Sequence, residues 1–178
     1  MTAETHFRPS WDDYFMAMTR LVATRSNCDR LAAGAILVKD NRIIATGYNG
    51  APPGLPHCDE VGHLMEGGHC VRTIHGEHNV LLQVARLQGA STIGTTLYSK
   101  YVPCIHCAKY IAACGIARVV FAKIYRNSDV VDYLKSAGIK VEVYKESLEW
   151  LKYLQQLFGQ EIEERQSPEG EVKIEGAV

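Results

Sequence analysis

Two short stretches, His75-Gly76-Glu77 and Pro103-Cys104-Ile105-His106-Cys107, decide how this chain folds. Together they offer the imidazole of His75, two thiols and one carboxylate, while His106 lies between the two cysteines and points elsewhere on the expected helix. A zinc ion with three protein ligands keeps a fourth position for water, whereas a structural zinc ion is closed by four ligands. We therefore expect His75, Cys104 and Cys107 to hold a catalytic zinc ion, with Glu77 as a base beside it.

The spacing within each motif predicts a helix start. Residues two apart on a helix point about 200° apart, so Glu77 does not share the metal with His75. An apolar run over residues 80–87 predicts that a helix begins near His75. Pro103 suits the first position of a second helix, and Cys104 and Cys107 then lie three apart on one face.

Each motif alone has a simpler interpretation. A C-x-x-C pair is also typical of a redox site or of half a structural zinc site, and a lone histidine is usually a core or surface residue. The two motifs flank a strand-like segment, Thr95 to Ser99, which can bring two helix starts together. This arrangement favours one joint site.

Length, composition and charge indicate an ordinary globular protein. The chain has 178 residues, 47% of them apolar, and we expect one domain over residues 1–158 followed by a polar, flexible tail over 159–178. A net charge of −1 without a lysine or arginine cluster argues against long nucleic acids as partners. No apolar run of ~18 residues and no signal-peptide pattern is present, so we expect a cytoplasmic protein without a membrane partner.

Helical and strand patterns alternate along the chain. They predict a three-layer α/β/α sandwich with a mixed five-stranded sheet and helices on both faces. Residues 49–72 are expected to form a long loop without secondary structure. The expected helices begin at Ser10, near His75, at Pro103 (to Cys114), at Ser128 (to Ala137) and at Glu146 (to Phe158), and the expected strands are Ala33 to Val38, Arg42 to Tyr48, Thr95 to Ser99, Arg118 to Ala122 and Ile139 to Tyr144.

The H-x-E and P-C-x-x-C motifs resemble the signature of zinc-dependent nucleobase deaminases. The loop Gly47-Tyr48-Asn49-Gly50-Ala51-Pro52-Pro53-Gly54 and the segment from Cys70 to Asn79 are similar to those of deoxycytidylate (dCMP) deaminases in the cytidine deaminase superfamily. The resemblance covers roughly residues 10–145 and implies a cytidine deaminase-like fold. Two departures are Gly76, where the family usually has alanine, and the run Ser99-Lys100-Tyr101-Val102 before the proline, where a small polar or hydrophobic run is expected. Lys100 can touch a substrate phosphate or face solvent, and we expect it to face solvent.

The resemblance implies hydrolytic deamination of dCMP to dUMP, with release of ammonia, by a water that zinc activates. This reaction supplies dUMP for thymidylate synthesis. The resemblance also implies a homo-oligomer, often a hexamer, that dCTP activates and dTTP inhibits. One alternative is another nucleotide or nucleobase deaminase, acting on dCTP or on tRNA adenosine. Another is a non-catalytic, nucleotide-binding regulatory subunit, although the intact Glu77 argues against it.

Two residues are predicted to bind the substrate. The resemblance implies that Asn49 contacts the sugar or the base, while an asparagine in a left-handed turn is the competing interpretation. Tyr125 follows a predicted strand and can stack on the pyrimidine, an interaction worth ~1–3 kcal/mol, or can simply pack in the fold.

A second group of cysteines suggests a second zinc ion. The resemblance to those dCMP deaminases that carry a structural zinc implies Cys28, Cys58, Cys70 and one histidine, His63 before His69, as ligands. A long loop without secondary structure needs something to order it, and four ligands would do so. Three free, partly buried thiols are the alternative.

Overall fold

The computed structural model describes residues 7–124 and 129–166 of the chain. It divides into two compact units, one formed by residues 10–145 and the other by residues 1–9 with residues 146–178. Within the described ranges, no helix is both long and apolar enough to cross a membrane. Whether residues 1–158 behave as a single domain stays a prediction.

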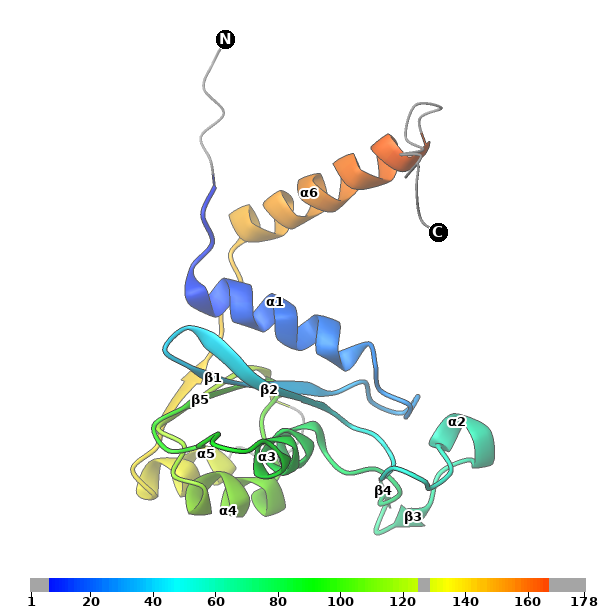
Figure 1. Cartoon of the computed structure of the whole chain (residues 1–178), viewed down its shortest axis with the longest axis vertical. Helices are drawn as coiled ribbons and strands as arrows, with labels where there is room; N and C mark the ends of the chain where they lie inside the picture. Colours follow the sequence, from blue (N-terminus) through cyan, green and yellow to red (C-terminus); the bar gives the residue numbers. More distant parts are fainter. Residues whose placement is uncertain (1–6, 125–128, 167–178) are drawn as a thin grey trace. The chain divides into compact units, whose positions relative to one another are not determined.

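The larger unit is built on a mixed five-stranded sheet (Figure 1). The strand order is β2-β1-β5-β6-β7. β1 is antiparallel to both of its neighbours, whereas β5, β6 and β7 run parallel. This sheet confirms the expected mixed, five-stranded architecture. The strands are β1 (Gly34–Lys39), β2 (Arg42–Tyr48), β5 (Thr96–Tyr101), β6 (Arg118–Lys123) and β7 (Lys140–Val143).

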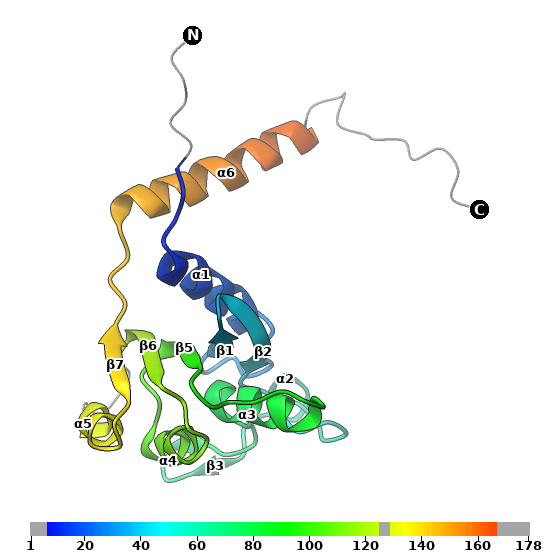
Figure 2. The ribbon, with the colours of Figure 1, turned by 60° about the vertical axis from the view of Figure 1, so that its left-hand side comes forward.

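Helices cover both faces of this sheet, which confirms the three-layer prediction (Figures 1 and 2). α1 (Trp11–Ala23) lies on one face, where Phe15 and Met16 pack against Ile36 and Tyr98. The opposite face carries the larger core, to which α3, α4 and α5 contribute. These three helices span Gly76–Arg86, Ile105–Ala113 and Asp129–Ser136.

Local sequence signals account for the first elements. Ser10 caps α1 by accepting a hydrogen bond from the Asp13 N–H at 3.1 Å, and the Asp13 carboxylate accepts in return from the Ser10 N–H. The β1–β2 hairpin turns at Asp40 and Asn41, with φ of 49° and 57°. Two successive left-handed residues match a type I′ hairpin turn, which asparagine and aspartate tolerate.

An ionic network connects α1 to β6 and β7. Arg118 donates to both carboxylate oxygens of Asp12, at 2.9 and 2.7 Å, and also to Glu142. Tyr98 completes the network by donating to Asp12 at 2.5 Å. Arg118 lowers the pKa of Asp12, and Lys140, followed by Arg118, lowers the pKa of Glu142.

A very close backbone approach fixes α3 against β2. A Cβ atom on Gly47 would lie 2.4 Å from the Gly76 carbonyl oxygen and 2.4 Å from the Val80 nitrogen. Only glycine allows this contact. The start of α3, and with it the first predicted zinc ligand, is therefore held directly on the sheet.

Several expected boundaries are wrong. The segment 49–72 contains a short helix, α2 (Cys58–Val61), and a two-stranded ribbon of β3 (Met65–Glu66) and β4 (His69–Cys70). α4 begins at Ile105, with Cys104 as its N-cap, so Pro103 precedes the helix rather than opening it. The final helix, α6 (Leu148–Gln166), extends beyond the expected end at Phe158.

The smaller unit consists of α6 and the segment before α1. Ser147 accepts a hydrogen bond from the Trp150 N–H at 3.1 Å at the start of α6. The centroid of the Phe7 ring lies 6.0 Å from that of the Trp150 ring and 5.0 Å from that of the Tyr153 ring. Helix α6 covers the first part of the expected tail over residues 159–178, and residues 167–178 lie outside the described residues.

Candidate active site

The two motifs meet at the starts of α3 and α4. His75 is the N-cap of α3 and Cys104 is the N-cap of α4, while Cys107 lies in the first turn of α4. β5 connects the two helices along the chain and lies in the sheet beneath them. The Nδ1 atom of His75 is 3.4 Å from the Cys104 sulfur and 3.6 Å from the Cys107 sulfur.

This triad has the dimensions of a zinc site. Zn–S and Zn–N bonds of about 2.3 and 2.1 Å in a tetrahedral site place sulfur and nitrogen about 3.6 Å apart. The observed separations of 3.4 and 3.6 Å agree with that spacing, and all three ligand atoms lie within 4.8 Å of one another. The residues present therefore fit a zinc ion with one imidazole and two thiolate ligands.

The pKa values of the two thiols of the triad are shifted in opposite directions. A hydrogen bond from Cys107, assisted by His75, lowers the pKa of Cys104 to about 3. The same hydrogen bond and burial raise the pKa of Cys107. One thiolate is therefore ready for a metal, and the second must release its proton when the metal binds.

Glu77 lies in the first turn of α3, beside the triad, and is only 5% exposed. Its Oε1 atom accepts a hydrogen bond of 2.6 Å from the hydroxyl of Ser99 on β5. Burial raises the pKa of this carboxyl group, and the Ser99 hydrogen bond opposes that rise. A buried carboxyl group with a raised pKa beside a metal-binding triad is a candidate for proton transfer.

A second cluster gathers the cysteines of the segment 49–72. The ligand atoms of Cys28, Cys58, His63 and Cys70 all lie within 4.8 Å of one another. The sulfurs of Cys58 and Cys70 are 3.6 Å apart, and Cys28 is 3.9 Å from Nδ1 of His63. Three thiols and one imidazole match a closed, structural zinc site.

The surroundings of this second cluster also suit a metal. Burial raises the pKa of Cys58 to about 12. Burial acts in the same direction on Cys70, but hydrogen bonds from the Arg72 backbone and from Cys58 outweigh it and lower that pKa to about 7. The other ring nitrogen of His63 lies 3.0 Å from Asp29, an arrangement typical of a metal-binding histidine.

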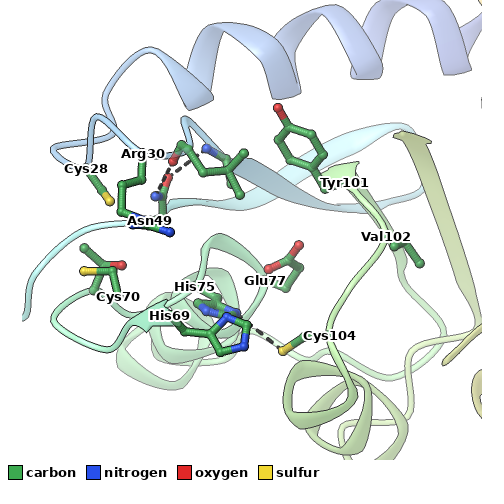
Figure 3. A pocket seen from close by; sticks show the side chains of 13 residues that line it. Cys28, Arg30, Asn49, His69, Cys70, His75, Glu77, Tyr101, Val102 and Cys104 are labelled. Atoms are coloured by element: carbon green, nitrogen blue, oxygen red, sulfur yellow. Dashed lines mark hydrogen bonds between the residues drawn. The ribbon is translucent and has the colours of Figure 1, made fainter. Parts of the chain in front are cut away.

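One pocket lies between the two clusters (Figure 3). Its wall includes Cys28 and Cys70 from the second cluster, His75 and Cys104 from the triad, and Glu77. His69, the alternative second-site ligand, lines this pocket and does not belong to the four-residue cluster. The remaining lining residues are Arg30, Leu31, Ala33, Asn49, Thr73, Tyr101 and Val102.

Asn49 lines the pocket, and its side chain also forms hydrogen bonds with the backbone of two other lining residues. Its Oδ1 accepts from the Ala33 N–H at 2.8 Å, and its Nδ2 donates to the Leu31 carbonyl at 2.5 Å. The positive-φ residues other than glycine in the described chain are Asp40 and Asn41, so Asn49 does not occupy a left-handed turn. Tyr125, the other predicted substrate contact, lies outside the described residues.

Two residues on β5 were interpreted incompletely from sequence. Lys100 does not simply face solvent, because its Nζ donates to the Ala32 carbonyl at 2.8 Å. Ser99 is fully buried and bonded to Glu77, a contact that the motifs do not indicate. The signal available was a hydroxyl two residues after Leu97, on the same face of a predicted strand, where a buried polar group needs a partner.

Comparisons with known proteins agree with this geometry. The family described as "Cytidine and deoxycytidylate deaminase zinc-binding region" matches residues 9–123. ComE operon protein 2 of Bacillus subtilis is 45% identical over 136 residues, which cover 76% of this chain and 71% of that protein. The deoxycytidylate deaminase of Schizosaccharomyces pombe is 38% identical over 147 residues, covering 78% of this chain but only 45% of that longer protein.

A solved structure shares the fold. The dCMP deaminase of cyanophage S-TIM5, in complex with dCMP and dUMP, is 33% identical and superposes with a TM-score of 0.69. The match covers 78% of this chain and 100% of that one.

Proposed function

The chain belongs to the cytidine and deoxycytidylate deaminase zinc-binding family, and on that basis we propose that it hydrolyses dCMP to dUMP and ammonia. The observation that carries this proposal is a buried carboxyl group, Glu77, at the wall of a pocket that is also lined by His75 and Cys104 of the metal-binding triad. Relatives named deoxycytidylate deaminase and a phage enzyme bound to dCMP and dUMP support this substrate.

His75, Cys104 and Cys107 hold the catalytic zinc ion in this proposal. When bound, zinc supplies Lewis acidity that lowers the pKa of water to about 7. Cys28, Cys58, His63 and Cys70 hold a second zinc ion, which closes the segment between β2 and α3.

Glu77 is the proton carrier. Its carboxylate accepts a proton from the attacking water as the water adds to C4 of the cytosine ring. The protonated carboxyl group gives this proton to N3 of the ring. It then takes the remaining proton from the hydroxyl group on C4 and passes it to the amino group, which departs as ammonia and leaves a carbonyl at C4. The carboxylate is restored at the end of the cycle, so protons balance with one water consumed.

Asn49 is the proposed contact to the sugar or base. One of its two Nδ2 hydrogens goes to the Leu31 carbonyl, which leaves the second for the substrate. Tyr125 is the proposed stacking partner of the pyrimidine. Arg30 lines the same pocket, and its positive charge complements a nucleotide phosphate.

The deciding experiment follows ammonia release from dCMP, dCTP, deoxycytidine, cytosine and an adenosine-containing tRNA. The proposal expects turnover of dCMP with the highest kcat/KM of the set. Turnover of dCTP, free base or tRNA in preference to dCMP would replace the substrate while keeping the deaminase family. A chain that binds these nucleotides but turns over none of them would instead be a regulatory subunit.

Regulation and assembly are separate parts of the proposal. We expect dCTP to raise and dTTP to lower the rate at subsaturating dCMP, and the protein to sediment as a homo-oligomer, with a hexamer as the first candidate. Rates measured with each nucleotide, and sedimentation at several protein concentrations, check both expectations.

A further inference from the structure

Ser99 occupies a position where the fold otherwise places apolar side chains. It lies on the central strand β5, paired with Ala35 of β1 on one side and Phe121 of β6 on the other. All three residues are fully buried. The same face of the sheet carries Leu97 and Val119 in the main core. A hydroxyl group in this apolar layer is unusual, because it needs a hydrogen-bond partner.

The hydroxyl of Ser99 is directed to one atom of the site. It donates to Oε1 of Glu77 at 2.6 Å, a short distance typical of a hydrogen bond to a charged oxygen. Ser99 is itself excluded from the pocket lining, whereas Glu77 belongs to it. Ser99 therefore contacts the carboxylate of Glu77 from the side that faces the sheet, and not from the pocket.

We propose that Ser99 is a positioning residue: its hydroxyl fixes Oε1 of Glu77 and leaves Oε2 as the oxygen that exchanges protons with water and substrate. This inference rests on the proposed function. The carboxylate of glutamate has three rotatable bonds behind it, so a fixed partner on one oxygen restricts the orientation of the other. The rigid central strand holds that partner in place.

A buried hydroxyl elsewhere provides a matched comparison. Thr19 on α1 is also fully buried, and its Oγ1 donates to the Phe15 carbonyl of its own helix at 2.8 Å. Thr19→Val and Ser99→Ala each remove one buried hydroxyl at nearly constant volume. Only the second substitution changes a contact to the site.

The test measures kcat, KM for dCMP and zinc content of the wild type, Ser99→Ala and Thr19→Val, and solves crystal structures of the zinc-loaded wild type and Ser99→Ala. For Ser99→Ala we expect kcat to fall roughly ten- to hundredfold, which is less than the ~10²–10⁴-fold contribution of the general acid–base group itself. KM should stay within about twofold and zinc content should be unchanged. Glu77 should be turned or split between two orientations, and Thr19→Val should keep the wild-type kcat.

An unchanged kcat in Ser99→Ala, an unchanged Glu77 orientation, or a loss of zinc that parallels the loss of kcat would each overturn the inference. Failure of the proposed function would give a different result, because the wild type itself would not turn over dCMP. The kinetic measurements would then use whichever of the tested nucleotides or bases the wild type deaminates. If it deaminates none of them, the two crystal structures still show whether Ser99→Ala changes the orientation of Glu77.

Discussion

The carboxyl group of Glu77 is the side chain on which turnover depends most directly. Glu77→Gln keeps the shape and the Ser99 contact but removes proton exchange. We expect turnover to fall by ~10²–10⁴-fold, while zinc content stays at the wild-type value because Glu77 is not one of the triad. Ammonia release and metal analysis of the same preparation check this expectation.

Glu149→Gln is the matched control, since Glu149 is exposed in the first turn of α6. It should retain wild-type turnover. If Glu77→Gln also retains it, another group carries the proton and the assignment is wrong.

At the level of single residues, the sequence identifies those whose types and spacing are typical of a metal site or a catalytic site. His75, Cys104 and Cys107 could be named because the residue types and the short spacing within each motif are typical of zinc ligands. The structure brings the three residues together, and their role as ligands stays a prediction. The contact between Ser99 and Glu77 could not be named. It joins residues 22 apart in sequence across a strand and a helix, and it depends on the registry of the sheet.

Among the elements, the close approach of β2 to α3 leads to a prediction about two glycines. Gly47→Ala would force a Cβ into backbone atoms at 2.4 Å, so we expect a loss of about 1–3 kcal/mol in unfolding free energy. Gly76→Ala is the matched control, because its Cβ would meet the Gly47 carbonyl at 3.2 Å. Alanine favours a helix by up to about 1 kcal/mol, which offsets that tight contact.

Urea unfolding of the two variants checks this contrast. Equal destabilisation by Gly47→Ala and Gly76→Ala would mean that the backbone contact is not what fixes α3. A stable Gly76→Ala variant would also show that the family's usual alanine fits this chain.

The segment between β2 and α3 should depend on its own metal. Cys58→Ser removes one thiolate from the second cluster, so we expect zinc content to fall from two ions per chain to one, and residues 49–72 to become sensitive to protease. Cys114→Ser, at the end of α4 and outside both clusters, should change neither property. Metal analysis and limited proteolysis with mass spectrometry check both variants.

Wild-type protein with a single zinc ion per chain would contradict the second site. So would a Cys58→Ser variant that keeps two ions and an intact segment.

Strongly periodic segments were predictable as elements, and the segment 49–72 was not. The strands and the helices after them follow regular apolar patterns, whereas α2, β3 and β4 have only two to four residues each. Such short elements do not follow from propensity, because local hydrogen bonds alone do not stabilise them. Contacts among the four clustered side chains explain them better. The predicted helix start at Pro103 was two residues too early, since Cys104 takes the N-cap position and α4 begins at Ile105.

Across the whole of residues 10–145, the network of Arg118, Asp12 and Glu142 joins the first helix to the last two strands of the sheet. Both carboxyl groups have lowered pKa values in the folded state. Their stabilising contribution is therefore present above the unfolded-state values of about 4 and is lost as the pH falls through the lower folded-state values. Acid should weaken this connection.

We expect Asp12→Asn to be less stable than the wild type at pH 7 and to lose less of its stability between pH 5 and pH 3. Asp132→Asn, at an exposed position in α5, should follow the wild-type curve. Unfolding free energies from urea titrations across that range provide the measurement. Parallel curves for Asp12→Asn and the wild type would mean that the network does not contribute to the loss of stability at acid pH.

The order of the cysteines along the chain has a consequence for how the protein is made. The proposed ligands of the second cluster end at Cys70, and the proposed ligands of the triad are complete only at Cys107. A ribosome therefore releases one full ligand set before the other exists, and each set can capture its ion in turn. A denatured chain presents all of these thiols at once, so renaturation in excess zinc invites scrambled ligation that synthesis from the N-terminus avoids.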